Sequence, residues 1–385
     1  MVSKLDRIKK WLEGGKAPPW HMQLQPTAKC NLACKFCWSS RYKREEKELS
    51  DEKWIEITRE ACEMGVKALT IVGGGEPLIR LNLVREMVRI IKGYDVWGTI
   101  VTNGTLFTQD FARELVEIGW DSVAISIDGA TAETDNYLRG NNAFELTMKS
   151  IHMINKWKEE LSSEKPNIIF HSVITRQNVH ELLDMIKLAK KARAGTFVLR
   201  MVNDDFSNPK FFITPEQFEL LKRQVEEVVE FAKKEEIDLD WQMNLEDVRR
   251  ILFNEKPPES SVKEERVKKK AIPCSRPFCE MVIIPDGTAG PCCAFCEGKY
   301  LNKIPLGDLP PKVLLEKKLF YKQLVESVME YVDDITNKSL KEVWEGEAFT
   351  KFRELVKKGE VPFFCKKTCP LDYVYLEESG KIVVH

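Results

Sequence analysis

The sequence lacks any long apolar run. No stretch of its 385 residues approaches the roughly 18 consecutive apolar residues of a membrane-spanning helix, and its amino terminus, MVSKLD, has no hydrophobic signal-peptide core. Charge of one sign is not in excess either, because 59 Lys and Arg face 60 Asp and Glu, for a net charge of -1. That balance gives no support for bulk electrostatic attraction to nucleic acid or anionic lipid, although it is compatible with a local basic patch. We expect a cytoplasmic protein with no membrane and no nucleic-acid partner.

Histidine is scarce and cysteine is not. The five histidines show no HxH or HxxxH spacing, so a mononuclear histidine metal site is not expected. Eleven cysteines in a chain without an export signal indicate metal ligands or catalytic groups, because the cytosol keeps thiols reduced. Three of them are Cys30, Cys34 and Cys37, seven lie beyond residue 270, and only Cys62 falls between these groups.

Short β-branched runs alternate with amphipathic helical patterns over the first two thirds of the chain, which is typical of parallel βα units. Strands are expected at residues 22–24, 68–72, 96–101, 122–127, 168–174 and 196–202. Helices are expected at residues 51–64, 81–91, 109–118, 143–157, 178–191 and 215–234. Six such units do not complete an eight-fold barrel. The prediction is an α/β fold with a partial (β/α)6 TIM-like barrel whose ligands gather at the carboxyl ends of the strands.

Four segments are expected along the chain: an N-terminal helix within residues 1–20, the barrel over 21–254, a linker over 255–270 and a smaller C-terminal α+β domain over 271–385. The linker, EKPPESSVKEERVKKK, has six basic and four acidic residues, two prolines and few apolar side chains, as a solvated connector has. The C-terminal domain opens with a hairpin around a Pro-Asp-Gly turn at 285–287, with cysteines near both ends.

The motif Cys30-x3-Cys34-x2-Cys37 follows the first expected strand directly. Three thiolates on one loop can hold three irons of a cubane and leave the fourth iron open to a ligand, although a structural zinc site lacking its fourth ligand has a similar pattern. The string CNLACKFC, with an aromatic Phe36 before the last cysteine, resembles the radical S-adenosylmethionine (SAM) enzymes. The resemblance implies a 4Fe-4S cluster that binds SAM, with Phe36 near the adenine.

The second strand runs into a glycine-rich stretch that is similar to the family's SAM-binding motif: Gly73, Gly74, Gly75, Glu76 and Pro77. In the family this motif binds the amino group of SAM. Glycines allow a backbone to approach a ligand closely, and a carboxylate can accept from an ammonium group. A phosphate loop is excluded because no Gly-Lys-Ser/Thr follows, whereas a plain strand-to-helix turn remains an alternative.

Polar residues follow the third and fourth expected strands as well. The resemblance makes Thr102, Asn103, Ser126 and Asp128 SAM contacts, with Ser126 near the ribose, and makes Arg139 a candidate for the methionyl carboxylate. Arg200 on the sixth strand matches the family's SAM-contacting positions less closely. For each of these residues the alternative is ordinary loop or core structure.

The C-terminal cysteines resemble the SPASM/twitch extension of the same superfamily. Cys274-x12-Gly287-x4-Cys292 matches its opening and Cys365-x3-Cys369 its end, with LGDL at 306–309 and SLKEVW at 339–344 as landmarks between. This resemblance implies that Cys274, Cys292, Cys365 and Cys369 ligate one auxiliary 4Fe-4S cluster.

The match to the full seven-cysteine pattern is incomplete, because the CxxCxxxxxCxxxC run is absent. Cys279, Cys293 and Cys296 are therefore either spare thiols or ligands of a second auxiliary cluster. A further alternative is a zinc site built from Cys293, Cys296, Cys365 and Cys369.

The resemblance implies a radical SAM oxidoreductase that takes one electron from a ferredoxin or flavodoxin and cleaves SAM to a 5'-deoxyadenosyl radical, which abstracts hydrogen from a substrate. GGGEP occurs in relatives acting on sugars, and about 20 residues before the first strand are too few for a leader-recognition domain, so we expect a small-molecule or carbohydrate-type substrate and an oxidation or rearrangement. The alternatives are a maturase of ribosomal peptides and a non-catalytic iron-sulfur or zinc scaffold. No catalytic side chain is assigned.

Overall fold

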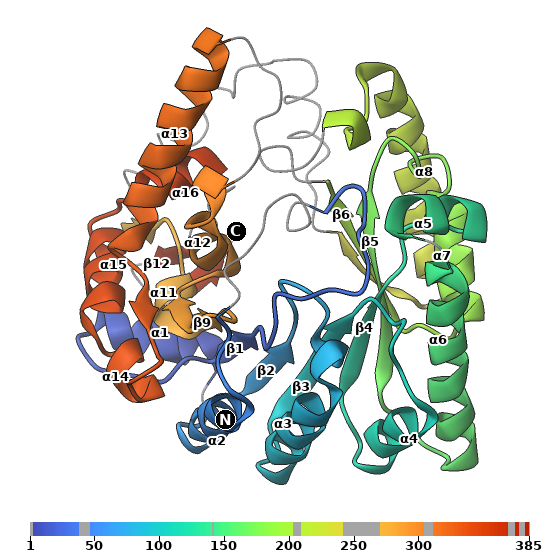
Figure 1. Cartoon of the computed structure of the whole chain (residues 1–385), viewed down its shortest axis with the longest axis horizontal. Coiled ribbons are helices and arrows are strands. Elements are labelled where there is room, and N and C mark those ends of the chain that lie inside the picture. Colours follow the sequence, from blue (N-terminus) through green and yellow to red (C-terminus); the bar gives the residue numbers. More distant parts are fainter. Residues whose placement is uncertain are drawn as a thin grey trace.

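Seven parallel strands form the centre of the fold in the computed structural model, which describes residues 3–37, 47–140, 142–202, 209–241, 270–303, 311–368, 374–376 and 382–384. These strands lie side by side in chain order, as in a curved, open barrel wall (Figure 1). They are β1 (His21–Leu24), β2 (Ala68–Ile71), β3 (Trp97–Thr102), β4 (Ser122–Ser126), β5 (Asn167–Ile174), β6 (Thr196–Met201) and β7 (Asp238–Trp241). The α/β partial barrel predicted from the sequence is confirmed, with β7 as an additional strand.

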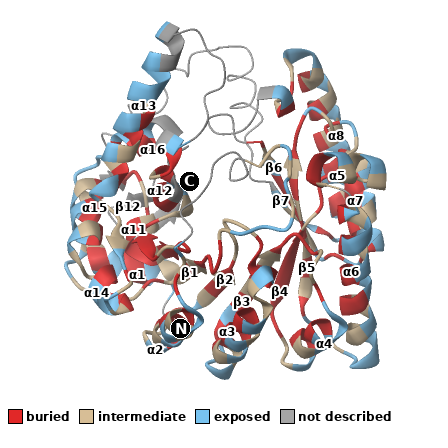
Figure 2. Cartoon of the chain, viewed as in Figure 1, coloured by how far each residue is buried: buried red, intermediate tan, exposed pale blue. Residues whose placement is uncertain are grey.

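The helices between these strands lie outside the curved sheet (Figure 1). They are α2 (Asp51–Glu63), α3 (Leu81–Gly93), α4 (Gln109–Glu117), α5 (Ala132–Arg139), α6 (Ala143–Glu160), α7 (Leu182–Lys191) and α8 (Pro215–Lys234), with 3-10 helices η2 (Pro77–Arg80) and η3 (Pro209–Phe211). Figure 2 shows that buried residues concentrate on the strands and on the helix sides that face them. No described helix combines the length and apolar character that crossing a membrane requires.

Several helices begin where a hydroxyl side chain accepts a hydrogen bond from the first turn. Ser50 caps α2 by accepting from the Lys53 N–H, and Thr108 caps α4 by accepting from the Phe111 N–H. Such a cap satisfies a backbone donor that has no partner within the helix. The sequence marks these starts, and the expected and observed helix starts agree at both positions.

The start of α7 differs from the sequence expectation. The pattern predicted a helix from residue 178, but α7 begins at Leu182. The side chain of Asn178 accepts from the Thr175 N–H at 2.7 Å and donates to the carbonyl of Asp128 at 2.8 Å. This side chain holds a turn between β5 and α7, because an asparagine that bonds to nearby backbone competes with the helix.

The C-terminal region continues the barrel sheet. Strand β9 (Glu280–Ile283) pairs in parallel with β1, and β10 (Thr288–Gly290) and β11 (Asp333–Asp334) extend the same sheet, so the order is β11-β10-β9-β1-β2-β3-β4-β5-β6-β7. The expected hairpin is confirmed as β9 and β10. A separate sheet contains β8 (Lys270–Ile272), β12 (Val374–Leu376) and β13 (Ile382–Val384). The remaining helices are α11 (Arg276–Cys279), α12 (Cys293–Gly298), η4 (Leu301–Lys303), α13 (Pro311–Met329), α14 (Leu340–Trp344), α15 (Glu347–Lys357) and α16 (Phe363–Thr368).

The proposed segment boundaries stay a prediction, since residues 242–269, which include most of the linker, lie outside the described ranges. The expected N-terminal helix is α1 (Lys4–Leu12), and it packs against the C-terminal region. The guanidinium of Arg353 lies 3.9 Å from the ring centre of Trp11 and 4.2 Å from that of Trp344. Helix α1 is therefore packed against α14 and α15 around one buried cation.

Gly98 in β3 offers a test of the packing behind the sheet. A Cβ atom there would lie 2.1 Å from the ring of buried Trp120, so Gly98→Ala is expected to lower the free energy of unfolding by about 1–3 kcal/mol. Urea unfolding followed by circular dichroism measures the change. Gly93→Ala at the end of α3 is the control, because its added methyl group meets no atom within 4 Å. Equal stability of both variants would contradict the packing described.

Candidate active site and auxiliary thiol cavity

The loop after β1 brings the first three cysteines together. The Cys37 N–H donates to the carbonyl of Cys34 at 3.1 Å, which closes a tight turn, and the Lys35 N–H donates to the carbonyl of Leu138 in α5 at 2.8 Å. Phe36 packs against a buried cluster that contains Leu138. Helix α5 therefore holds the second half of this cysteine loop in place.

The three thiols fit a cluster that takes one thiolate at each of three irons. Burial raises the pKa of the Cys34 thiol to about 12, against the opposing charge of Arg139, and burial also raises the pKa of Cys30. Such thiols stay protonated until a metal displaces the proton. Cys30 is the most exposed of the three, which leaves one side of the loop open.

The glycine-rich loop after β2 is bonded to the start of the cysteine loop. The Gly75 N–H donates to the Thr27 carbonyl at 3.2 Å, and the Glu76 N–H donates to the Lys29 carbonyl at 2.8 Å. A Cβ atom at position 75 would lie 1.9 Å from the carbonyl oxygen of Lys29. Only glycine permits this approach, so the two motifs predicted from the sequence are adjacent in space for a steric reason.

Glu76 is buried and its carboxylate already has three donors within the protein. One oxygen accepts from the Leu78 N–H at 3.0 Å and the Thr102 hydroxyl at 2.7 Å, and the other accepts from the Asn103 N–H at 2.6 Å. Burial raises the pKa of Glu76, although these hydrogen bonds and Arg139 oppose the rise. In the structure Glu76 joins the carboxyl ends of β2 and β3 through these hydrogen bonds. Its contact with the amino group of SAM stays a prediction. Pro77 is buried at the start of η2 beside it.

Asn31 also belongs to this network, although it was not among the residues predicted from the sequence. Its side-chain oxygen accepts from the Asn103 amide at 2.8 Å, and its amide donates to the Thr105 hydroxyl at 2.8 Å. The link ties the cysteine loop to the end of β3. A lone asparagine between two cysteines carries no signal of this contact in the sequence.

Asp128 and Arg139 form a buried ion pair at the end of β4. Their closest atoms lie 2.8 Å apart, and the Asp128 carboxylate also accepts from the Val173 N–H at 2.7 Å. Arg139 is 3% exposed, and its charge lies near the Cys34 thiol. The arginine predicted to meet the methionyl carboxylate is thus paired with Asp128 in the described structure, and its role toward SAM stays a prediction.

Ser126 lies at a half-buried position of β4, and Arg200 lies at an exposed position of β6. Ser126 ends β4 opposite His171 of β5, whose pKa burial lowers to about 4 with help from the charges of Arg200 and Arg139. His171 is therefore neutral at pH 7 and was not singled out by the sequence. Arg200 is exposed near the carboxyl end of β6, and the charges near it include Cys293 and Arg276 of the C-terminal region. Its predicted contact with the cofactor is untested.

Four of the C-terminal thiols line one cavity of about 110 Å3. The cavity wall consists of Pro273, Cys274, Ser275, Arg276, Pro291, Cys292, Cys293, Ala294, Phe295, Phe352, Phe364 and Cys365. Three of the four predicted auxiliary ligands are thus together, whereas Cys369 lies outside the described residues. The donor set fits an iron-sulfur cluster. Cys293, for which the sequence left several roles open, lines the same cavity.

Cys279 and Cys296 point elsewhere. The Cys279 thiol donates to the Ser275 carbonyl at 3.3 Å, and the Cys296 thiol donates to the Val282 carbonyl at 3.5 Å. Both are fully buried, and neither lines the cavity. The described geometry favours the interpretation of these two thiols as structural groups.

Across the described ranges, no three His, Cys, Asp or Glu side chains converge tightly enough to hold a single metal ion. A cubane differs from such a site because each thiolate binds a separate iron. The proposed zinc site includes Cys369, so it is not decided by the described residues.

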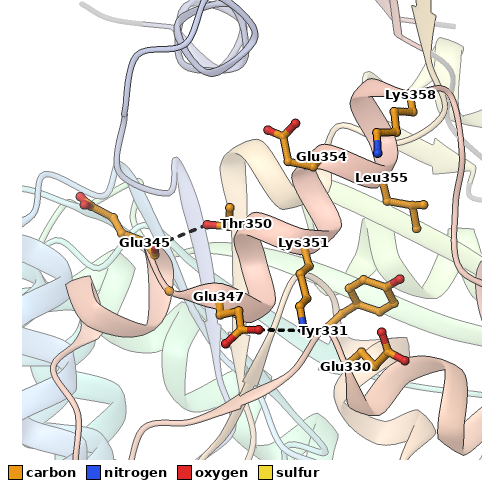
Figure 3. Close-up of a pocket in the computed structure, with 10 residues that line it drawn as sticks. Glu330, Tyr331, Glu345, Glu347, Thr350, Lys351, Glu354, Leu355 and Lys358 are labelled. Atoms are coloured by element: carbon orange, nitrogen blue, oxygen red, sulfur yellow. Dashed lines mark hydrogen bonds and ion pairs between the residues drawn. The ribbon is translucent and has the colours of Figure 1, made fainter.

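A larger groove of about 550 Å3 lies on the outer side of the C-terminal region. Figure 3 shows that charged side chains line it, with Lys351 paired to Glu347 at 2.8 Å. No cysteine or histidine lines this groove. Its size therefore does not mark it as the place of the chemistry, which the thiols locate instead.

Two family models match the chain. Residues 24–203 match the radical SAM superfamily, and residues 274–370 match the SPASM iron-sulfur cluster-binding domain. The first match covers β1 to β6, and the second covers the auxiliary thiol cavity.

Curated relatives are similar over about half of their length. The mycofactocin maturase MftC of Mycobacterium tuberculosis H37Rv is 31% identical over 201 residues, which are 52% of this chain and 49% of the relative. The tungsten-containing aldehyde ferredoxin oxidoreductase cofactor-modifying protein of Pyrococcus furiosus is 29% identical over 43% of this chain and 47% of its own length. The PqqA peptide cyclase of Rhizobium meliloti is 28% identical over 46% of this chain and 45% of its own length.

Among solved structures, Streptococcus suis SuiB bound to its precursor peptide SuiA superposes with a TM-score of 0.60. The sequences are 17% identical, and the match covers 94% of this chain and 78% of that one. At this identity the likeness shows a shared fold.

Gly75→Ala tests the contact between the two loops of the first site. The added methyl group collides with the Lys29 carbonyl and displaces the cysteine loop, at a cost of about 1–3 kcal/mol. We expect SAM affinity of the reconstituted protein to fall about tenfold or more in equilibrium dialysis with labelled SAM. Gly93→Ala, which adds the same group in open space, should bind SAM like the wild type. Unchanged SAM binding by Gly75→Ala would refute the steric argument.

Iron counts test the assignment of the C-terminal thiols. After anaerobic reconstitution the wild type should hold about eight irons per chain, Cys292→Ala about four, and Cys279→Ala and Cys296→Ala the full wild-type number. The last two variants only lose a hydrogen bond to a carbonyl, so circular dichroism should show a native fold. A folded Cys279→Ala or Cys296→Ala protein lacking about four irons would show that the assignment is wrong.

Proposed function

Because the chain belongs to the radical SAM superfamily and carries a SPASM iron-sulfur domain, we propose that it is an enzyme that modifies a peptide by radical chemistry. When bound, the 4Fe-4S cluster and SAM supply a 5'-deoxyadenosyl radical, which removes a hydrogen atom from a substrate C–H bond. The oxidoreductase class expected from the sequence is kept as part of this proposal.

One observation carries the radical chemistry: the cysteine loop, the glycine loop and the end of β3 form a single hydrogen-bonded unit, which Arg139 joins to Asp128 at the end of β4. The Lys29 carbonyl binds the Glu76 N–H, the Glu76 carboxylate binds the Asn103 N–H, and the Asn103 amide binds Asn31. A site built this way holds its groups in place before the ligand arrives, which is what positioning catalysis requires. In this proposal Cys30, Cys34 and Cys37 hold the cluster.

The protein's own groups also control charge at this site. Arg139 places a cation beside the Cys34 thiol, which favours the thiolate that a metal needs. His171 stays neutral and can accept or donate a hydrogen bond at the same edge of the sheet. These side chains would orient SAM and substrate, whereas none is assigned a proton-transfer step.

The names of relatives favour a peptide over the small molecule expected from the sequence. A PqqA peptide cyclase and a maturase are among the curated relatives, and SuiB has been crystallised with a precursor peptide. The described sheet is open, with β7 and β11 at its edges, and an open sheet gives an extended chain access to the carboxyl ends of the strands. The Pyrococcus furiosus relative, named for cofactor modification, keeps a non-peptide substrate as the competing outcome.

The auxiliary thiol cavity supports an oxidative result. Cys274, Cys292 and Cys365 would hold an auxiliary cluster there, and such a cluster would supply an acceptor for one electron in an oxidation. The initial electron would come from a ferredoxin or flavodoxin. A cytoplasmic location remains an expectation of the sequence.

Deuterium transfer tests the substrate class. Reconstituted protein with dithionite and SAM is incubated with deuterated synthetic peptides, one at a time, whose sequences are encoded by reading frames beside the gene. Mass spectrometry then measures the deuterium content of the 5'-deoxyadenosine formed. We expect one peptide to donate deuterium, Cys34→Ala to reduce 5'-deoxyadenosine formation at least about 100-fold, or about 2.7 kcal/mol in barrier, and Cys62→Ala to match the wild type.

Cys62 is the matched control because it is a buried thiol of α2 away from both sites. Deuterium transfer from sugars but from no peptide would refute the peptide proposal. Absence of 5'-deoxyadenosine from protein holding about eight irons would refute the enzyme proposal and favour an iron-sulfur scaffold.

A further inference from the structure

Arg276 is the one cation among the described residues that line the auxiliary thiol cavity. It opens α11, two residues after Cys274, and the charged groups near it include Cys292, Cys293 and Cys274. The rest of the described wall is thiol, aromatic, proline, alanine and serine. A guanidinium therefore faces the place where a negatively charged cluster would sit.

An ion-pair chain fixes this guanidinium. Arg276 pairs with one oxygen of Glu280 at 2.6 Å, and Lys4 of α1 pairs with the other at 3.0 Å. The guanidinium is charged at neutral pH, as arginine is throughout proteins, and its ion pair with Glu280 favours that charged form. Glu280 is mostly buried, yet the charges of Arg276 and Lys4 keep its pKa below the usual value. Both groups are ionised at neutral pH.

These two charges act on reduction with opposite signs. Reduction of an iron-sulfur cluster adds one negative charge to a group whose thiolates are already negative, and reduction potentials follow the net charge and the hydrogen bonds around the cluster. A fixed cation on the wall stabilises the reduced state, and a fixed anion beside that cation weakens the effect. The Glu280 side chain is 12% exposed and the Arg276 side chain is 40% exposed, so solvent reduces the effect of the cation in part but does not abolish it beside the mostly apolar cavity wall.

We propose that Arg276 is a positioning residue that raises the reduction potential of the auxiliary cluster, and that Glu280 moderates this effect. The pair thereby sets how readily the cluster takes an electron at the end of turnover. This inference rests on the auxiliary cluster of the proposed function, and it is independent of which substrate the enzyme takes.

The test measures the potential without turnover. In a Cys30→Ala/Cys34→Ala/Cys37→Ala background only the auxiliary cluster remains, and dithionite titration followed by electron paramagnetic resonance gives its midpoint potential. Arg276→Gln should lower the constant for one-electron reduction at least tenfold, which is about 59 mV. Arg276→Lys, which keeps the charge, should restore most of the wild-type value.

Glu280→Gln should shift the midpoint potential in the opposite direction to Arg276→Gln. Loss of its negative charge should raise the potential, a result that general loosening of the cavity does not produce. Lys299→Gln is the control for the loss of a cation, because Lys299 pairs with Asp286 at 2.5 Å and does not line the cavity. Its potential should equal that of the parent.

Each variant is first shown to hold about four irons per chain in this background. If Arg276→Gln does not hold the cluster, the midpoint potentials of Arg276→Lys and Glu280→Gln are compared instead. The first should stay near the parent value and the second should lie above it. An unchanged potential in Arg276→Gln, or shifts of the same sign in Arg276→Gln and Glu280→Gln, would overturn the proposal. Neither result would alter the deuterium test of the peptide substrate.

Discussion

The parallel ladder of β9, β1 and β2 is the constraint on which the rest of the structure depends. His21 of β1 lies opposite Ala68 on one side and Glu280 on the other, so the barrel wall and the C-terminal region share one sheet. The cysteine loop leaves the end of β1, and the auxiliary thiols flank β9 and β10. Because hydrogen-bonded strands keep a fixed spacing and register, the two thiol sites hold a fixed relation to each other. A flexible link between separate domains would not provide this.

At the first site the buried charges of Glu76 and Asp128 are tolerated because both carboxylates accept backbone hydrogen bonds. Glu76 accepts from two backbone N–H groups and a hydroxyl, and Asp128 accepts from a backbone N–H while it pairs with Arg139. Burying an unpaired charge costs far more than burying one that is paired and hydrogen-bonded. The same bonds that compensate for burial also connect neighbouring strand ends, so the edge of the sheet is rigid where a cofactor would bind.

The second site uses charge differently. Its thiols lie among aromatic and proline side chains, and Arg276 on the wall pairs with Glu280, whose other carboxylate oxygen pairs with Lys4. The packing of α1 against the C-terminal region brings Lys4 to this place, so a residue near the start of the chain adjusts the surroundings of cysteines near its end. The first site thus depends on hydrogen bonds among strand ends, and the second on one cation of the cavity wall and the ion pairs behind it.

The sequence alone determined the superfamily and the architecture, because the spacing of Cys30, Cys34 and Cys37, the glycine motif and the alternation of strands and helices are local patterns. It also predicted Cys274, Cys292, Cys365 and Cys369 as ligands of one cluster, and one cavity brings the first three together, while Cys369 lies outside the described residues. Only the tertiary structure showed that Cys293 lines the cavity whereas Cys279 and Cys296 do not. Only the tertiary structure showed the places of three further residues in the two sites, because their surroundings come from other elements of the fold: Asn31, His171 and Arg276. The register of β9 on β1 was equally beyond the sequence, since strand pairing across some 250 residues leaves no periodic signal in either strand. Motifs of neighbouring residues can be recognised in the sequence, whereas the spatial neighbours of each side chain depend on which strands and helices pack together.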